Sequence, residues 1–112
     1  MTTLSTKALE RSTYVLTIAF KDSTGTAVVP DSITWDLTDS SGNVINSRST
    51  VVVAVPAASI DIVLSGDDLA IQRAGILGRV VTVEAVYDST KGNNLPFKDE
   101  VVFQILPLVN IA

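Results

Sequence analysis

The amino-acid sequence predicts an all-β fold, an antiparallel β-sandwich of seven or eight strands in a single domain. Three observations predict the sandwich. Several segments alternate apolar and polar residues with a period of two, valine supplies much of the 46% hydrophobic content, and short turn sequences separate the alternating segments. Valine loses side-chain freedom in helices and packs well on a pleated sheet. A chain of 112 residues fits one domain of ordinary size.

Five segments carry the alternation. They span residues 12–20, 32–39, 59–65, 79–88 and 99–106. Within the second segment, Ile33, Trp35 and Leu37 share one face, and polar side chains take the other. One apolar and one polar face is typical of antiparallel strands packed on one side only. The alternation places on the core-facing rows Tyr14, Leu16, Ile18, Phe20, Ile33, Trp35, Leu37, Ile60, Ile62, Leu64, Val81, Val83, Ala85, Val101, Phe103 and Ile105, with Tyr87 at the end of its row beside a turn.

Similar turn sequences lie between these segments. They read KDSTGT at 21–26, TDSSGN at 38–43 and, with one residue inserted, YDSTKGN at 87–93. In such a turn the Asp side chain accepts hydrogen bonds from the turn backbone, and the glycine adopts a positive φ at little steric cost. We interpret these sequences as recurrent hairpin corners.

One segment predicts a short helical turn between the strands near 60–64 and 79–87. The sequence SGDDLAIQRAG at 65–75 has capping candidates in Ser65 and Asp67, acids in its first turn and a glycine at its end. The acidic pair Asp67 and Asp68 has a second interpretation as half of a carboxylate dyad for acid–base chemistry. The start of a helix explains the pair more simply.

A chemical alternative exists for the TDSSGN corner, where oxygen-bearing side chains could surround a cation. The residues concerned are Asp36, Asp39, Gly42 and Asn43. An EF-hand loop needs glycine at its sixth position and glutamate at its twelfth. Counted from Asp36, the glycine falls at the seventh position and the twelfth is Ser47. The sequence therefore favours a plain turn, and it predicts no metal, cofactor or catalytic residues.

Composition excludes several classes of function. The chain has no cysteine and no histidine, which removes disulfide frameworks, thiolate metal sites and the commonest general base. Its net charge is -4, and its eight basic residues are scattered from Lys7 to Lys98, so nucleic-acid binding is not expected. No segment reaches the ~20 apolar residues of a membrane span. The N-terminal sequence lacks the features of a signal peptide. We expect a soluble protein made in the cytoplasm.

Two surface interpretations stay open at this point. Trp35, Tyr14 and Tyr87 would line a sugar-binding face if they pointed outward, although alternation places the first two in the core and leaves Tyr87 as the candidate for exposure. An apolar outer patch is predicted on the last two strands, opposite their core faces. It consists of Val80, Val86, Val102 and Leu106. Such a patch marks either a contact with another chain or a surface that residues 1–11 or the helical segment cover.

The order of residues from Phe20 to Val44, F-x-D-x-x-G followed by P-x-x-I-x-W-x-L-x-D-x-x-G-x-V, resembles the first half of an immunoglobulin-like or fibronectin-III-like domain. In that resemblance Trp35 takes the place of the core tryptophan of strand C. The sequence VTVEAVYDSTKGNNLPFKDEVVFQI resembles the closing F–G hairpin. Antibody domains have two core cysteines, which this chain lacks. The implied organisation is an N-terminal arm at 1–11, a sandwich at 12–106 and a C-terminal tail at 107–112.

Small immunoglobulin-like domains with this style of turn are similar to the accessory domains of tailed-bacteriophage structural proteins. The resemblance implies a non-enzymatic virion protein, a capsid decoration (cement) or tail-associated domain, that binds major capsid or tail subunits. Homo-oligomerisation is compatible with such a role. The alternative expectation is a cell-surface adhesion or carbohydrate-binding module, which would bind glycans through outward aromatic side chains.

Overall fold

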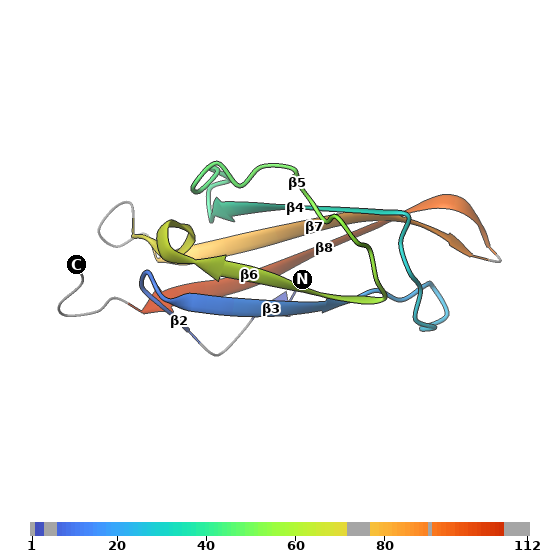
Figure 1. The fold of residues 1–112 in the computed structure, drawn as a ribbon, viewed down its shortest axis with the longest axis horizontal. Coiled ribbons are helices and arrows are strands. Elements are labelled where there is room, and N and C mark those ends of the chain that lie inside the picture. The colour runs from blue at the N-terminus through green and yellow to red at the C-terminus, as the bar shows by residue number, and fades with distance from the viewer. Residues whose placement is uncertain (1, 4–6, 72–76, 90, 107–112) are drawn as a thin grey trace.

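Two β-sheets pack against each other in the computed structural model, which describes residues 2–3, 7–71, 77–89 and 91–106. Figure 1 shows the two layers, with β3 and β6 in one and β4, β7 and β8 in the other. The elements are β1 (Thr2–Thr3), β2 (Ala8–Leu9), β3 (Thr13–Ala19), β4 (Ser32–Asp39), β5 (Val51–Val52), β6 (Ser59–Ser65), the 3₁₀ turn η1 (Gly66–Leu69), β7 (Gly78–Ser89) and β8 (Gly92–Leu106). The prediction of an all-β sandwich with one short helical turn is confirmed.

The larger sheet has the order β1-β8-β7-β4-β5, and β2 also pairs with β8. The smaller sheet is the antiparallel pair β3–β6. The strand orders β4-β7-β8 and β3-β6 are those of strands C-F-G and B-E in immunoglobulin domains. The larger sheet is mixed rather than purely antiparallel, because β1 and β2 run parallel to β8, with Thr2 opposite Val101 and Ala8 opposite Ile105. These pairings cover two residues each, too few to produce an alternating pattern.

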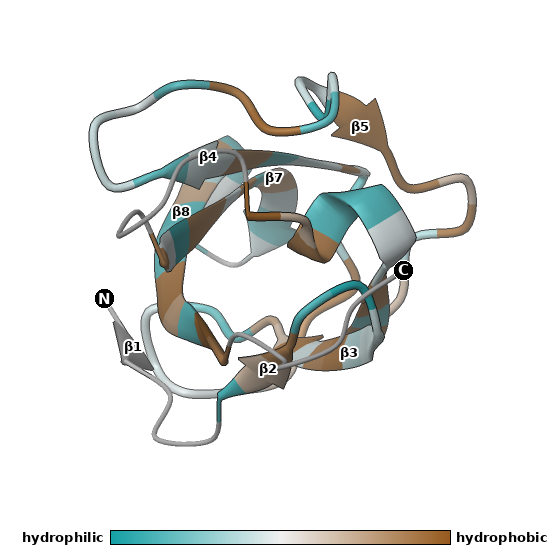
Figure 2. Cartoon of the chain, turned by 90° about the vertical axis from the view of Figure 1, so that its left-hand side faces the viewer, coloured by the Kyte–Doolittle hydropathy of each residue, from teal (hydrophilic) through white to brown (hydrophobic). Residues whose placement is uncertain are grey.

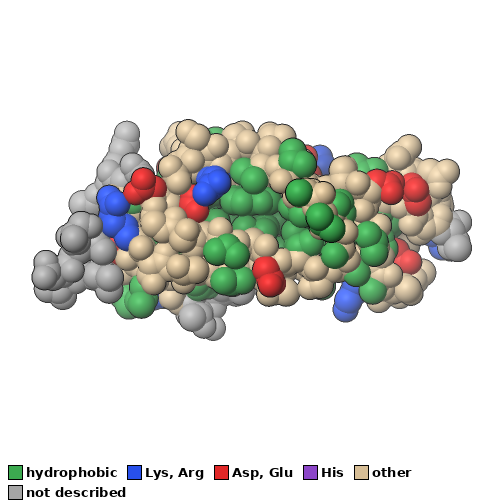
Figure 3. Space-filling model, in the orientation of Figure 1, with side chains coloured by type: hydrophobic (Ala, Val, Ile, Leu, Met, Phe, Trp, Pro, Cys, Tyr) green, Lys and Arg blue, Asp and Glu red, His purple; other side chains and the backbone are tan. Residues whose placement is uncertain are grey.

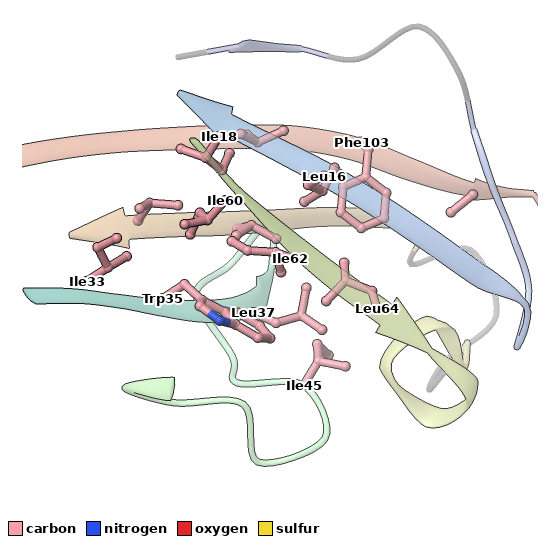
Figure 4. Packing of buried hydrophobic residues seen from close by; sticks show 14 of the residues in the cluster. Leu16, Ile18, Ile33, Trp35, Leu37, Ile45, Ile60, Ile62, Leu64 and Phe103 are labelled. Atoms are coloured by element: carbon pink, nitrogen blue, oxygen red, sulfur yellow. The ribbon is translucent and has the colours of Figure 1, made fainter. Parts of the chain in front are cut away.

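The core lies between the sheets, where side chains of β4 point toward those of β6 (Figure 4). Trp35 is 7% exposed and packs in this cluster, as predicted. Tyr14 is partly buried, and its ring lies 4.8 Å from that of Phe103. The buried cluster comprises Ala8, Leu16, Ile18, Phe20, Ile33, Trp35, Leu37, Ile45, Ile60, Ile62, Leu64, Leu69, Val81, Val83, Ala85, Val101, Phe103 and Ile105.

The β7–β8 hairpin reaches beyond the sandwich (Figure 1) and contributes to an elongated shape of 52 × 25 × 24 Å. Tyr87, the aromatic residue predicted as a candidate for exposure, lies on this hairpin beside a register shift and is half-buried. The physical reason is that the smaller sheet is too short to cover the hairpin: β3 and β6 have seven residues each, against twelve and fifteen in β7 and β8.

The N-terminal arm joins the sandwich through β1 and β2, and Ala8 is fully enclosed. The predicted C-terminal tail at 107–112 and the end of the predicted helical segment, residues 72–75, lie outside the described residues. Among the described residues, no helix is long and apolar enough to cross a membrane.

Candidate interaction surface

The segment at residues 51–58, VVVAVPAA, carries the most exposed large apolar side chains of the described chain. We call it the valine segment. Val52 is 71% exposed and Val55 is 79% exposed. The segment joins β5, at the edge of the larger sheet, to β6 in the smaller one (Figure 1). Figure 2 shows β5 as a hydrophobic element at the outer rim, and Figure 3 shows hydrophobic side chains gathered on the same side of the molecule. Exposed apolar clusters of this kind mark contacts with other chains.

Backbone pairing holds the valine segment in place at both ends. At its start, Val51 pairs with Trp35 and the N–H of Val53 donates to the carbonyl of Ile33 at 3.0 Å. At its end, the carbonyl of Ala58 accepts from the backbone N–H of Phe20, the residue that follows β3, at 2.8 Å. Val51 and Val53 pack against the core, which leaves Val52 to point outward. The exposed valines are therefore presented by an anchored segment.

The loop that leads into the valine segment is strained. Thr50 has a φ of +50°, and a β-branched residue rarely adopts this left-handed conformation. Its backbone N–H donates to the carboxylate of Asp36, which supports the conformation. Backbone strain that the surrounding structure maintains is often found at functional sites. The strain in this loop therefore supports the choice of the valine segment as the candidate surface.

Asp68 ties the same loop to η1. Its carboxylate is fully buried and accepts hydrogen bonds from Arg48 Nε at 2.8 Å, Asn46 Nδ2 at 2.9 Å and the backbone N–H of Ser65 at 3.1 Å. Burial on its own raises the pKa of Asp68, but these hydrogen bonds together outweigh it and hold the pKa below its ordinary value. Asp68 is a structural anchor between two segments.

Asp67 and Asp68, for which a carboxylate dyad was the alternative to a helix start, have separate ion-pair partners. Asp67 makes an exposed ion pair with Arg11 at 2.9 Å, whereas Asp68 pairs with Arg48. Each of the two acids is therefore neutralised by a different arginine. An acid–base pair would instead need two carboxyls facing one substrate-sized space.

A polar cleft of about 870 Å³ lies between the β4 turn, the loop after it and η1. Its lining includes both charge signs, among them the Arg11–Asp67 pair, Asp39 and the fully buried Arg79. Arg79 Nη2 donates to the carbonyl of Ala70 at 3.0 Å. Burial lowers the pKa of Arg79, and the charge of Asp39 opposes that shift. Each of these charged side chains has a structural contact: Arg11 pairs with Asp67, Asp39 accepts turn hydrogen bonds, and Arg79 donates to backbone carbonyls.

The TDSSGN corner is a turn. Asp39 Oδ1 accepts from the backbone N–H groups of Ser41 at 2.8 Å and Asn43 at 3.0 Å, and Gly42 has a φ of +90°. Hydrogen bonds from the Asn43 side chain and backbone lower the pKa of Asp39. The KDSTGT corner repeats the arrangement around Asp22. Within the described residues, no group of three or more acids is placed to hold a metal ion.

The outer apolar patch predicted on β7 and β8 is not continuous. Val80 lies opposite Val102, but the rows between this pair and Val86 are polar. Those rows pair Thr82 with Glu100 and Glu84 with Lys98. Leu106 lies farther along β8, opposite Leu9 of β2, and both are exposed. The strand register therefore breaks the predicted patch into separate pairs, because the intervening positions of both strands are polar.

The sequence prediction missed the valine segment as a surface. The available signal was the longest apolar run of the chain, which is interrupted by Pro56 and lacks alternation.

Searches of protein-family models, of curated proteins and of solved structures found no match to this chain.

Proposed function

We propose that this chain is a non-enzymatic structural protein of a tailed-bacteriophage particle, a capsid decoration or tail-associated domain, that binds neighbouring virion subunits through the valine segment. The observation that carries the proposal is the exposure of Val52 and Val55 on a segment anchored to both sheets. A partner that covers these side chains removes apolar surface from water, which favours association.

The magnitude of this contact favours repeated attachment. Full burial of a valine contributes roughly 1.5–3 kcal/mol, so two valines contribute about 3–6 kcal/mol. Association of two proteins costs an estimated ~4–15 kcal/mol in lost translational and rotational freedom. One copy bound through these valines alone would bind weakly, whereas neighbouring copies on a symmetric particle would gain avidity. Capsid and tail lattices provide such repeated sites.

The arrangement of the aromatic side chains gives little support to the alternative of a carbohydrate-binding module. Trp35 is in the core, and the Tyr14 ring packs on Phe103. Stacking against sugars would require aromatic side chains together on one exposed face.

Co-sedimentation with virus particles tests the proposal. The purified chain is mixed with particles assembled without it, and with isolated capsids and tails, and each mixture is pelleted. We expect saturable binding to one of these assemblies, with a fixed number of copies per particle. A chain that pellets with none of them at any concentration would contradict the proposal.

A further inference from the structure

Among the described strands, none pairs with the edge of β3 that faces away from β6. The N–H of Phe20 donates to the carbonyl of Ala58 at 2.8 Å, which makes this pair a hydrogen-bonded one. Hydrogen-bonded and non-hydrogen-bonded pairs alternate along an antiparallel ladder. Val15, Thr17 and Ala19 therefore direct their backbone N–H and C=O groups away from β6. No strand of the described chain pairs with β3 on this side.

A groove of about 310 Å³ runs beside this edge. It is lined by residues 15–19 of β3 and, on the other side, by Asp99 and Val101 of β8. In immunoglobulin constant domains, strand A lies at this position, next to strand B. Here β1 and β2 pair with β8 instead. Among the described residues, the place of one strand beside β3 is empty.

Among the described strands, the unpaired edges of β3 and β8 differ in composition. Residues 92–100 of β8 pair only with β7 among the described strands, and they include Pro96, Lys98 and Glu100. Proline and charged residues are the devices by which proteins prevent edge-to-edge association. Residues 13–19 of β3, TYVLTIA, contain neither proline nor a charged side chain. The β3 edge therefore lacks the proline and charged residues that oppose edge-to-edge association along β8.

We propose that the β3 edge pairs with β3 of a second copy of this chain, antiparallel about a two-fold axis. A second copy fits because the strand has no charge, so self-pairing places no like charges opposite each other. A register centred on Leu16 pairs all seven residues and sets Val15 opposite Thr17 of the second copy. A two-fold contact of this kind closes on itself and gives a dimer.

This dimer uses a different surface from the valine segment and goes beyond the proposed function. Its product is one continuous four-stranded sheet, β6-β3-β3-β6, with about eight new backbone hydrogen bonds at its centre. Extended strands commonly associate through free sheet edges in this way. Each copy would keep its valine segment available to another partner.

Two matched variants test the proposal, Val15→Lys and Val63→Lys. Val15 and Val63 are opposite each other in the β3–β6 pair, on the same outer face, and are 51% and 54% exposed. In the dimer, a lysine introduced at position 15 of each copy would lie in the central strand pair, whereas one introduced at position 63 would lie one strand away from it. The change at position 15 therefore places two like charges at diagonal positions of the new strand pair, within reach of long side chains.

Sedimentation equilibrium from roughly 1 μM to 1 mM measures the association. We expect the wild-type chain and Val63→Lys to form dimers, and Val15→Lys to raise the dimer dissociation constant about tenfold or more. Val15→Pro removes an outward N–H group without breaking the β3–β6 ladder, and it should also raise the dimer dissociation constant. Fluorescence of the buried Trp35 reports whether each variant is folded. A wild-type chain that is monomeric at every concentration, or equal weakening by the two lysine variants, would overturn the proposal.

Discussion

Arg48 Nε donates a 2.8 Å hydrogen bond to the fully buried carboxylate of Asp68, and Nη2 of the same arginine donates to the second oxygen at 3.3 Å. This fork connects the loop before β5 with the turn after β6. Since β5 begins the valine segment, the ion pair fixes the approach to the proposed contact surface. Under the proposed function, stability and binding are therefore expected to be coupled through this side-chain pair.

Replacing Arg48 with alanine should lower the free energy of unfolding by about 1–3 kcal/mol, because the buried carboxylate loses its charged partner while water reaches the site from the arginine side. The matched control is Arg11→Ala. Its pair with Asp67 is exposed on both sides, so its removal should cost less than about 1 kcal/mol. Urea unfolding measures both values. Equal losses from the two variants would show that Asp68 is not the anchor described here.

Stability should fall in acid through Asp68. Its pKa in the folded state lies below the ordinary value of 3.8, because the hydrogen bonds to its carboxylate outweigh the effect of burial. A lowered folded pKa gives stability that is present above the unfolded pKa and is lost as pH falls through the folded value. We expect the thermal midpoint to drop between about pH 5 and pH 2. In Asp68→Asn, the midpoint should be lower at pH 7 and fall less steeply in acid. A variant with the same slope as the wild-type chain would contradict this assignment.

Gly42→Ala should destabilise the chain by about 1–2 kcal/mol through backbone strain alone, because φ is +90° and a new Cβ would meet no atom within 4 Å. At Gly78 the cause differs, since a Cβ there would lie 2.6 Å from Ser40 Oγ. Adding Ser40→Ala to Gly78→Ala should restore part of the stability that Gly78→Ala loses. Adding Ser40→Ala to Gly42→Ala should restore none. Chemical denaturation of the single and double variants distinguishes the two mechanisms.

Calcium should have no effect on stability. The Asp39 carboxylate already accepts hydrogen bonds from the turn that it caps. A bound cation would raise the unfolding midpoint in proportion to the logarithm of its concentration above the dissociation constant. We expect the same midpoint in millimolar calcium and in chelator. A concentration-dependent rise would restore the cation interpretation of the corner.

Alternation in the sequence predicted the core well where two sheets face each other. Ile33, Trp35 and Leu37 are buried as expected, because a period of two decides which face of a strand meets the core. The same period places Tyr87 on the core-facing row although it is only half-buried, since alternation does not reveal where the opposing sheet ends. The parallel pairing of β1 and β2 left no periodic signal, because each strand has only two residues.

The surfaces were harder to predict than the core. The outer patch was inferred from Val80 and Val102 without the register between β7 and β8, and that register places charged rows beside them. The exposure of Val52 depends on how residues 51–58 cross from one sheet to the other. A run of valines in the sequence does not distinguish a buried strand from an anchored, exposed one.

The most direct test of the valine segment as the contact surface uses the double variant Val52→Asp, Val55→Asp. Its affinity is measured for the assembly that binds the wild-type chain. Val29→Asp is the matched control, since Val29 is 61% exposed and lies outside the valine segment. We expect the double variant to bind about 100-fold more weakly or not at all, a loss of roughly 3 kcal/mol or more, while the control binds like the wild-type chain. A double variant that remains folded and binds with unchanged affinity would contradict the role assigned to the valine segment.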